Sequence, residues 1–183
     1  MLLAIDPGSL RTGYALFEER GKVQELGVFC PEDGLSAPER LIQVVQFIRE
    51  YIGSFEVTTV ACESWGGPRN PTLQVLITAI GQMVRGLKKD WTTYPPGSVL
   101  VGVKPRHMPA KTTEERKTAM RVGVLALHPY LRRKVAKCEP ELMQDAIDAV
   151  AVGECHMGKE REKLLTKLVN ESNSAQKRGR KKV

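Results

Sequence analysis

Apolar and polar positions along the chain predict three strands first and an alternation of strands and helices afterwards. Apolar and β-branched runs predict strands near residues 1–6, 11–18 and 22–30, which are able to pair as a meander. Apolar positions spaced three and four residues apart then predict a helix near 36–52. A β-branched apolar run predicts a fourth strand near 57–62.

The second half of the chain continues the alternation. A loop rich in Gly and Pro is predicted at 64–71, followed by a helix near 72–89. The run Ser-Val-Leu-Val-Gly-Val at 98–103 predicts a fifth strand, and helical periodicity predicts helices near 112–127 and 140–157. Strands that pair as a meander and then alternate with helices indicate an α/β fold, a mixed five-stranded sheet flanked by helices.

The length and the C-terminal composition predict one domain and a basic tail. A chain of 183 residues is long enough for one domain with a substantial core, which we place at residues 1–158. Residues 159–183 form a basic C-terminal helix or tail. From about residue 171 the chain is charged and polar, so it cannot bury a core, and we expect disorder there.

Two aspartates in an otherwise apolar helix are the first candidate chemistry. Asp145 and Asp148 are three residues apart and therefore lie on one helix face, among Ala, Ile and Val residues. A buried carboxylate is costly unless it is paired or bound to a metal, and a second carboxylate beside it adds repulsion. The sequence has no Lys or Arg between Lys137 and Lys159, so a hard divalent cation is the predicted counter-charge.

Two further acids stand at the ends of predicted core strands. Asp6 ends the first apolar run and opens an Asp-Pro-Gly-Ser turn, and Glu63 directly follows the fourth predicted strand. An isolated Asp in such a turn is often only a solvated turn residue. Together with the Asp145/Asp148 pair, however, the two strand-end acids predict a cluster of four carboxylates.

The charge distribution predicts a nucleic-acid partner. The chain has a net charge of +7, and residues 104–137 hold 10 basic and 2 acidic side chains. Residues 138–158 hold 5 acids and no basic residue, and the tail is basic again. Cations around a carboxylate cluster suit a metal-dependent nuclease, because the cations hold phosphates while the acids hold metal.

Membrane association is not expected. No apolar run approaches the ~20 residues that a membrane span requires, and the N-terminus lacks the basic start and apolar stretch of a signal peptide. Four scattered cysteines indicate reduced thiols in a cytoplasmic protein. Neither the cysteines nor the three histidines have metal-ligand spacing, so the predicted metal site is oxygen-rich.

The acids and their surroundings resemble one family. Leu3-Ala4-Ile5-Asp6-Pro7-Gly8-Ser9, with Thr12-Gly13-Tyr14, is similar to the opening signature of RuvC-type Holliday junction resolvases. Glu63 and the Asp145/Asp148 pair follow in that family's order and approximate spacing, and Gly81-Gln82-Met83-Val84-Arg85-Gly86 resembles its small-residue helix. The resemblance spans roughly residues 1–157.

The resemblance implies a ribonuclease H-like fold and a dimeric endonuclease that cuts four-way and other branched DNA. It implies two Mg²⁺ ions per active site, with Mn²⁺ as a substitute, held by Asp6, Glu63, Asp145 and Asp148. Asp6 would bridge both ions. The resemblance does not say which helix aspartate binds which ion, nor which DNA sequence is preferred.

Basic residues after the predicted fifth strand are the candidate phosphate ligands. By resemblance, Lys111 and Lys117 best match two basic positions near the scissile phosphate, and Lys104 or Arg116 are alternatives. Arg106 belongs to the same basic block. These five basic residues are the predicted DNA contacts in the segment that follows the predicted fifth strand.

The loop after Glu63 is the candidate region for recognition of junction shape. Trp65, Arg69 and Asn70 place an aromatic ring, a cation and an amide on a turn beside the predicted metal site. Trp65 resembles the family's junction-inserting aromatic, although it stands two residues after the glutamate. Packing of the ring beneath its own loop is the alternative, because stacking on bases and burial require the same side chain.

A C2 homodimer is expected because paired cuts on a two-fold symmetric junction require two active sites. The helix at 72–89 is the predicted contact, with Gly81 permitting close approach. Its apolar positions exceed what one sheet face might bury, and they are Leu73, Leu76, Ile77, Ile80 and Val84.

Two other classes of protein have a similar N-terminal sequence. A YqgF-like RNA-processing nuclease shares the opening strand and acid, and the segment 64–90 and the basic tail favour a junction resolvase over it. A phosphate-binding ATPase domain of the actin and sugar-kinase type also opens with strand, Asp, Gly and hairpin. That architecture normally needs two such domains, so 183 residues argue against it.

Overall fold

The computed structural model describes residues 1–64, 70–136 and 139–180. The predicted DNA contacts Trp65 and Arg69 lie outside these described residues.

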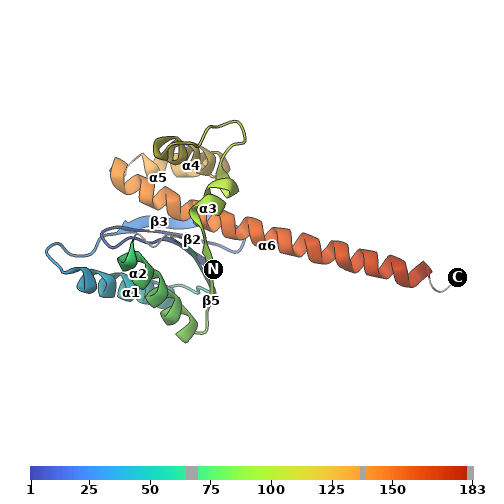
Figure 1. Cartoon of the computed structure of the whole chain (residues 1–183), viewed down its shortest axis with the longest axis horizontal. Coiled ribbons are helices and arrows are strands. Elements are labelled where there is room, and N and C mark those ends of the chain that lie inside the picture. Colours follow the sequence, from blue (N-terminus) through green and yellow to red (C-terminus); the bar gives the residue numbers. More distant parts are fainter. Residues whose placement is uncertain (65–69, 137–138, 181–183) are drawn as a thin grey trace.

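A five-stranded mixed sheet forms the centre of the molecule, in the order β3-β2-β1-β4-β5 (Figure 1). Strands β1 (Leu2–Asp6), β2 (Thr12–Phe17) and β3 (Val23–Phe29) form an antiparallel meander. Strand β4 (Thr59–Glu63) lies parallel to β1, and β5 (Asp90–Tyr94) lies parallel to β4. The predicted mixed five-stranded sheet is therefore confirmed.

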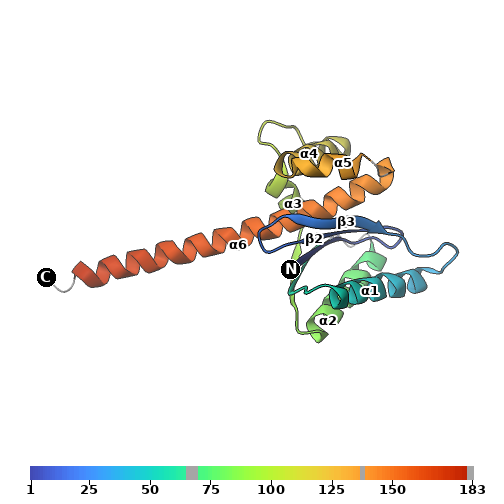
Figure 2. The same cartoon turned by 180° about the vertical axis from the view of Figure 1, so that it is seen from behind.

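Two amphipathic helices cover one face of the sheet. Helix α1 (Ala37–Ser54) begins at a capping box in which Ser36 and Glu39 satisfy each other's backbone N–H groups. Helix α2 (Pro71–Gly86) begins at Asn70, whose side chain accepts a hydrogen bond from the Leu73 N–H at 3.1 Å. Both helices bury apolar stripes in one cluster with residues of β1, β2 and β4, and Figure 2 shows them together below the sheet.

Helices of the second half of the chain cover the opposite face, as seen in Figure 1. They are α3 (Pro96–Val103), α4 (Thr113–Leu127), the 3₁₀ turn η1 (Pro129–Leu131), α5 (Arg132–Val135) and α6 (Pro140–Arg180). The sheet is therefore sandwiched between two helical layers, each with its own apolar cluster.

The predicted strand at 98–103 is wrong, because these residues form helix α3. The fifth strand is the preceding segment 90–94, Asp-Trp-Thr-Thr-Tyr, which is rich in the aromatic and β-branched residues that favour strands. The run at 98–103 is apolar but short, and periodicity does not distinguish a buried strand from a buried helix at that length. Pro96 at the first helical position favours the helical alternative.

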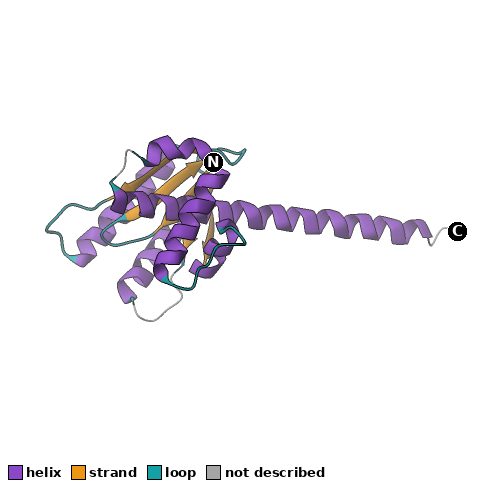
Figure 3. Cartoon of the chain, turned by 90° about the horizontal axis from the view of Figure 1, so that it is seen from above, coloured by secondary structure: helices purple, strands orange, loops and turns teal. Residues whose placement is uncertain are grey.

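Helix α6 is continuous from the core to Arg180 and projects well beyond the body of the molecule (Figures 1 and 3). Residues 171–180 therefore continue helix α6, whereas the composition led us to expect disorder from about residue 171. Extending an existing helix adds one hydrogen bond per residue without a new nucleation cost. A segment that buries no core can therefore stay helical when it continues a helix whose first half is packed.

None of the helices in the described part of the chain is long and apolar enough to cross a membrane.

Candidate active site

Asp6 and Glu63 lie side by side at one end of the sheet. Strands β1 and β4 are parallel neighbours with Ile5 opposite Cys62, and the two acids are the next residue of each strand. Carboxyl ends of adjacent parallel strands meet at one edge, which is a usual place for a functional site. A side-chain hydrogen bond joins the two carboxyl groups.

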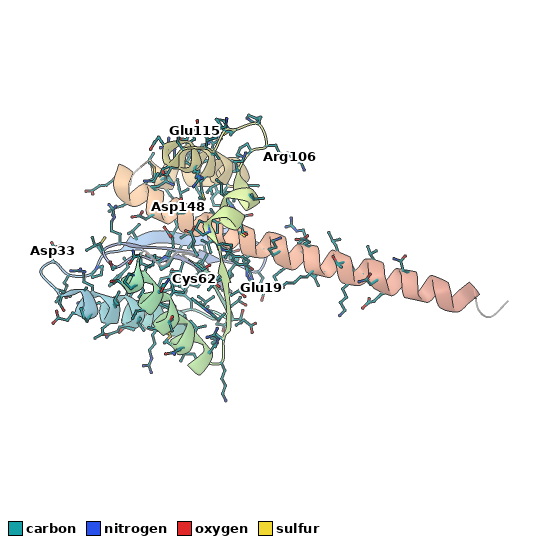
Figure 4. The ribbon with its side chains drawn as sticks, in the orientation of Figure 1. Glu19, Asp33, Cys62, Arg106, Glu115 and Asp148 are labelled. Carbon is teal, nitrogen blue, oxygen red and sulfur yellow. The ribbon has the colours of Figure 1, made fainter. Side chains whose placement is uncertain are left out.

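Helix α6 brings Asp145 and Asp148 to the same edge. This helix packs across β2 at Gly13, and Gly13 pairs with Asp6 in the neighbouring strand. A Cβ at Gly13 would lie only 2.0 Å from the Asp145 carbonyl oxygen, so glycine is required for this close approach. Figure 4 shows Asp148 on α6 facing the sheet near the end of β4, with Cys62 beneath it.

The four carboxyl groups interact electrostatically, and Asp6 is the most perturbed. Burial raises the pKa of Asp6 well above its ordinary value of 3.8, and repulsion from the other three acids raises it further. Burial also raises the pKa of Glu63, whereas the hydrogen bond from Asp6 lowers it. Asp6 is therefore the acid of the pair whose ionised form is more strongly disfavoured.

Asp148 is similarly destabilised as an anion. Burial raises its pKa to about 7, and repulsion from Glu63 and Asp145 acts in the same direction. The Gln144 amide donates a 2.7 Å hydrogen bond to Asp148 Oδ1 and, together with the positive charge of Lys117, opposes the shift. Helix α4 thus supplies a cation close enough to influence the acid cluster.

Asp145 has a direct cationic partner. Arg11 lies on the turn between β1 and β2, and its Nε is 3.0 Å from Asp145 Oδ2. The two side chains are 41% and 23% exposed, so the ion pair lies at the solvent-facing rim of the cluster.

The donor chemistry of the cluster suits a hard divalent cation. Within residues 1–64, 70–136 and 139–180, no group of three or more Asp, Glu, His or Cys side chains is arranged to coordinate an ion as it stands. Oxygens of the cluster are engaged in the Asp6–Glu63 hydrogen bond and the Arg11–Asp145 ion pair. A divalent cation would relieve the repulsion that raises these pKa values, after Asp6 loses its proton and Asp145 exchanges its partner.

The predicted basic residues occupy different positions relative to the cluster. Lys117 lines a cleft that contains Asp145 and also affects the pKa of Asp148. Lys104 instead donates a 2.8 Å hydrogen bond to the Met108 carbonyl, and Arg116 donates a 3.1 Å hydrogen bond to the Ala110 carbonyl. Both of these side chains stabilise the connection between α3 and α4.

Two exposed basic residues lie in that same connection. Lys111 is exposed just before α4, and its backbone N–H donates to the Glu115 carboxylate at 2.7 Å. Arg106 is exposed and extends from the loop away from the acid cluster (Figure 4). Of the five predicted basic contacts, the structure therefore places Lys117 at the cluster.

The predicted roles of Asn70 and of helix α2 need revision. Asn70 caps the helix, so its amide oxygen is already used by the Leu73 N–H. Leu76, Ile80 and Val84 are fully buried against the sheet and are unavailable to a partner subunit. A Cβ at Gly81 would lie 2.8 Å from the Trp91 indole nitrogen.

The proposed contact on α2 is therefore wrong for most of its residues, because the stripe covers the sheet and Gly81 accommodates Trp91. Leu73 and Ile77 are half-buried, and Val75 is 59% exposed.

Three residues near the cluster escaped prediction. Gln144 is four residues before Asp148, and Arg121 is four residues after Lys117. Residues four apart are neighbours on a helix surface, so the sequence could have predicted that these two residues lie beside the candidate residues. Arg11 is brought to Asp145 only by the packing of α6 on β2, and its position in the sequence carries no such signal.

Comparisons with known proteins find similarity in sequence and in fold. The profile of the family described as "Crossover junction endodeoxyribonuclease RuvC" matches residues 2–87. The crossover junction endodeoxyribonuclease RuvC of Synechococcus sp. (strain WH7803) is 25% identical over 91 residues. That alignment spans 48% of this chain and 59% of the relative.

Solved structures share the fold over most of the chain. Thermus thermophilus RuvC in complex with a Holliday junction substrate superposes with a TM-score of 0.67 at 16% identity, covering 88% of this chain and 95% of that chain. The fowlpox virus resolvase in complex with Holliday junction DNA gives a TM-score of 0.58 at 12% identity, covering 86% and 97%. The predicted mixed five-stranded sheet flanked by helices is thus confirmed as a fold that this chain shares with these two resolvases, and its N-terminal sequence is similar to RuvC.

Proposed function

We propose that this RuvC-like chain is a structure-selective endodeoxyribonuclease that resolves four-way DNA junctions by paired, metal-dependent phosphodiester hydrolysis. The observation that carries the proposal is the electrostatically coupled set of four carboxyl groups at one sheet edge, next to a cleft with basic side chains. The likeness to RuvC and to a viral resolvase supports the choice of substrate.

The four acids would hold two Mg²⁺ ions, with Mn²⁺ as a substitute, because all their donors are carboxylate oxygens. When bound, such a pair activates a water molecule and stabilises the departing 3′ oxygen. Asp6 feels the charges of all three other acids, so it would contribute to holding both ions. The Gln144 hydrogen bond orients Asp148.

Basic residues would bind and orient the DNA backbone. Lys117, which lines a cleft together with Asp145, would contact a phosphate at the acid cluster, and the exposed Lys111 precedes the same helix. Lys104 and Arg116 hold the intervening loop and would shape this surface indirectly.

Exposed Arg106, together with Trp65, Arg69 and Asn70 in the loop after Glu63, would extend the contact to the arms and centre of the junction. Asn70 would do so by fixing the start of α2.

Paired cuts require two active sites, so we propose that a homodimer is the working assembly. The buried stripe of α2 covers the sheet and is not available to a second subunit. The contact surface of the dimer would therefore be limited to the more exposed residues of that helix, or would lie on another element.

A labelled four-way junction and a matched duplex test the proposal, each incubated with purified protein in Mg²⁺ or in EDTA. We expect cleavage of the junction only, only with Mg²⁺, at symmetric positions. Structured RNA belongs in the same panel, because cleavage of RNA without cleavage of the junction would favour the YqgF-like alternative. ATP hydrolysis without nuclease activity would favour the actin and sugar-kinase type.

Isosteric variants separate the acids from folding. Asp6→Asn, Glu63→Gln, Asp145→Asn and Asp148→Asn should each remove most cleavage while junction binding survives, because they remove charge and keep shape. Asp33→Asn is the matched control, since Asp33 is exposed on the loop between β3 and α1, far from the cluster (Figure 4). Full activity of two or more cluster variants at saturating Mg²⁺ would contradict the proposal.

A further inference from the structure

A charged cleft of about 480 Å³ adjoins the acid cluster on the side of helix α4. Its walls include the cations Arg11, Lys117 and Arg121, together with the Thr118 hydroxyl. Asp145 closes the end that is shared with the cluster.

The cations converge on the cleft from two separate elements. Lys117 and Arg121 are one turn apart on α4 and therefore point to the same side of that helix. Arg11 arrives from the turn between β1 and β2. Three cations face the two acids of the cleft, Glu114 and Asp145, and Asp145 is already paired with Arg11. The remaining positive charge suits a singly charged anion.

The Arg11–Asp145 ion pair uses the same oxygens that a divalent cation would need. Arg11 Nε lies 3.0 Å from Asp145 Oδ2, and the Arg11 side chain is 41% exposed on a surface turn. Its partial exposure on a turn makes this side chain a candidate for exchanging one anionic partner for another.

We propose that Arg121 extends into this cleft the phosphate contact already proposed for Lys117, and that Arg11 exchanges Asp145 for that phosphate when a divalent cation occupies the acid cluster. The inference rests on the proposed function, because it assigns a substrate group to a cleft beside the proposed active site. Before metal binds, Arg11 neutralises Asp145. Afterwards its guanidinium, which suits bidentate contact with phosphate oxygens, is available to the DNA.

The phosphate part is tested by measuring junction binding in EDTA over a range of KCl concentrations. Wild-type protein is compared with Arg121→Gln, which removes one predicted phosphate contact, and with Arg49→Gln. Arg49 is the matched control because it is exposed on α1, on the opposite face of the sheet. The slope of log K against log salt should become shallower by about 0.9 for Arg121→Gln and stay unchanged for Arg49→Gln.

The exchange part is tested without DNA, by titrating Mn²⁺ into full-length protein and following free Mn²⁺ by electron paramagnetic resonance. Arg11→Gln should bind Mn²⁺ several-fold more tightly than wild type, because Arg11 no longer competes with the ion for Asp145. Arg11→Lys keeps the charge and should retain weaker, wild-type-like binding. Thermal denaturation of each variant checks that it is folded.

The outcomes distinguish this inference from the proposed function. If wild-type protein cuts the junction but Arg121→Gln keeps the wild-type salt slope and affinity, the phosphate subsite is refuted and the nuclease proposal stands. If Arg11→Gln binds Mn²⁺ no more tightly than wild type, the exchange is refuted. If wild-type protein neither binds nor cuts the junction, the proposed function itself fails.

Discussion

The buried carboxyl groups should make the metal-free protein less stable as the pH rises, and Asp148 allows the size of the effect to be calculated. Its pKa is raised from 3.8 to about 7 in the folded state. A group with a raised folded-state pKa stabilises the fold fully below its unfolded pKa, and this contribution disappears as the pH rises through the folded value. Asp6 is shifted in the same direction.

Linkage between protonation and folding gives the magnitude. For pKa values of 3.8 and about 7, the contribution of Asp148 falls by roughly 2–3 kcal/mol between pH 5 and pH 8. For a chain of this length that corresponds to a decrease in Tm of roughly 5–10 °C. Asp148→Asn removes the titration and keeps an oxygen that can accept the Gln144 hydrogen bond.

Chemical denaturation in EDTA at pH 5 and pH 8 measures the effect. The stability difference between wild type and Asp148→Asn should change by roughly 2–3 kcal/mol between the two pH values, with the variant gaining relative to wild type at pH 8. Asp33→Asn, at an exposed loop position, should follow wild type. Saturating Mg²⁺ at pH 8 should stabilise wild type more than Asp148→Asn. A pH-independent difference between wild type and the variant would refute the reasoning.

Three further changes have defined outcomes. Gly13→Ala would place a Cβ 2.0 Å from the Asp145 carbonyl oxygen and should therefore displace α6. We expect the free energy of unfolding to fall by about 1–3 kcal/mol and cleavage to be abolished. An active variant with wild-type Tm would contradict the packing argument. Asn70→Ala removes the α2 cap and should lower the free energy of unfolding by about 1 kcal/mol, as measured by thermal denaturation. Asn70→Asp keeps a capping oxygen and should therefore retain most of the wild-type stability. Deletion of residues 171–183, which carry five cations and one acid, should weaken junction and duplex binding together and flatten their salt dependence. The single-turnover cleavage rate at saturation should stay nearly unchanged, and its collapse would exclude a generic electrostatic role.

Local pattern predicted four of the five strands and most of the helices, because burial on a sheet or helix face imposes a period on the sequence. It failed at residues 90–103, where the strand and the helix are both short. There the choice depends on which segment completes the parallel pair with β4, and that is a long-range contact. Helix α2 shows a related limit: its apolar stripe was visible, but the sequence does not say whether the stripe meets the sheet or a second subunit.

The sequence by itself determined the chemistry of the candidate site. Asp6 and Glu63 follow apolar strands, and Asp145 and Asp148 share one helix face, so all four acids were predictable from periodicity and position. Only the tertiary structure decided what surrounds them. Arg11 reaches Asp145, and Lys117 and Arg121 reach the same cleft, because α6 packs closely on β2 at Gly13 and α4 packs on α6. The contact between Arg11 and Asp145 joins residues more than a hundred positions apart. The local period of a helix or strand cannot predict such contacts, because they are set by how whole elements pack.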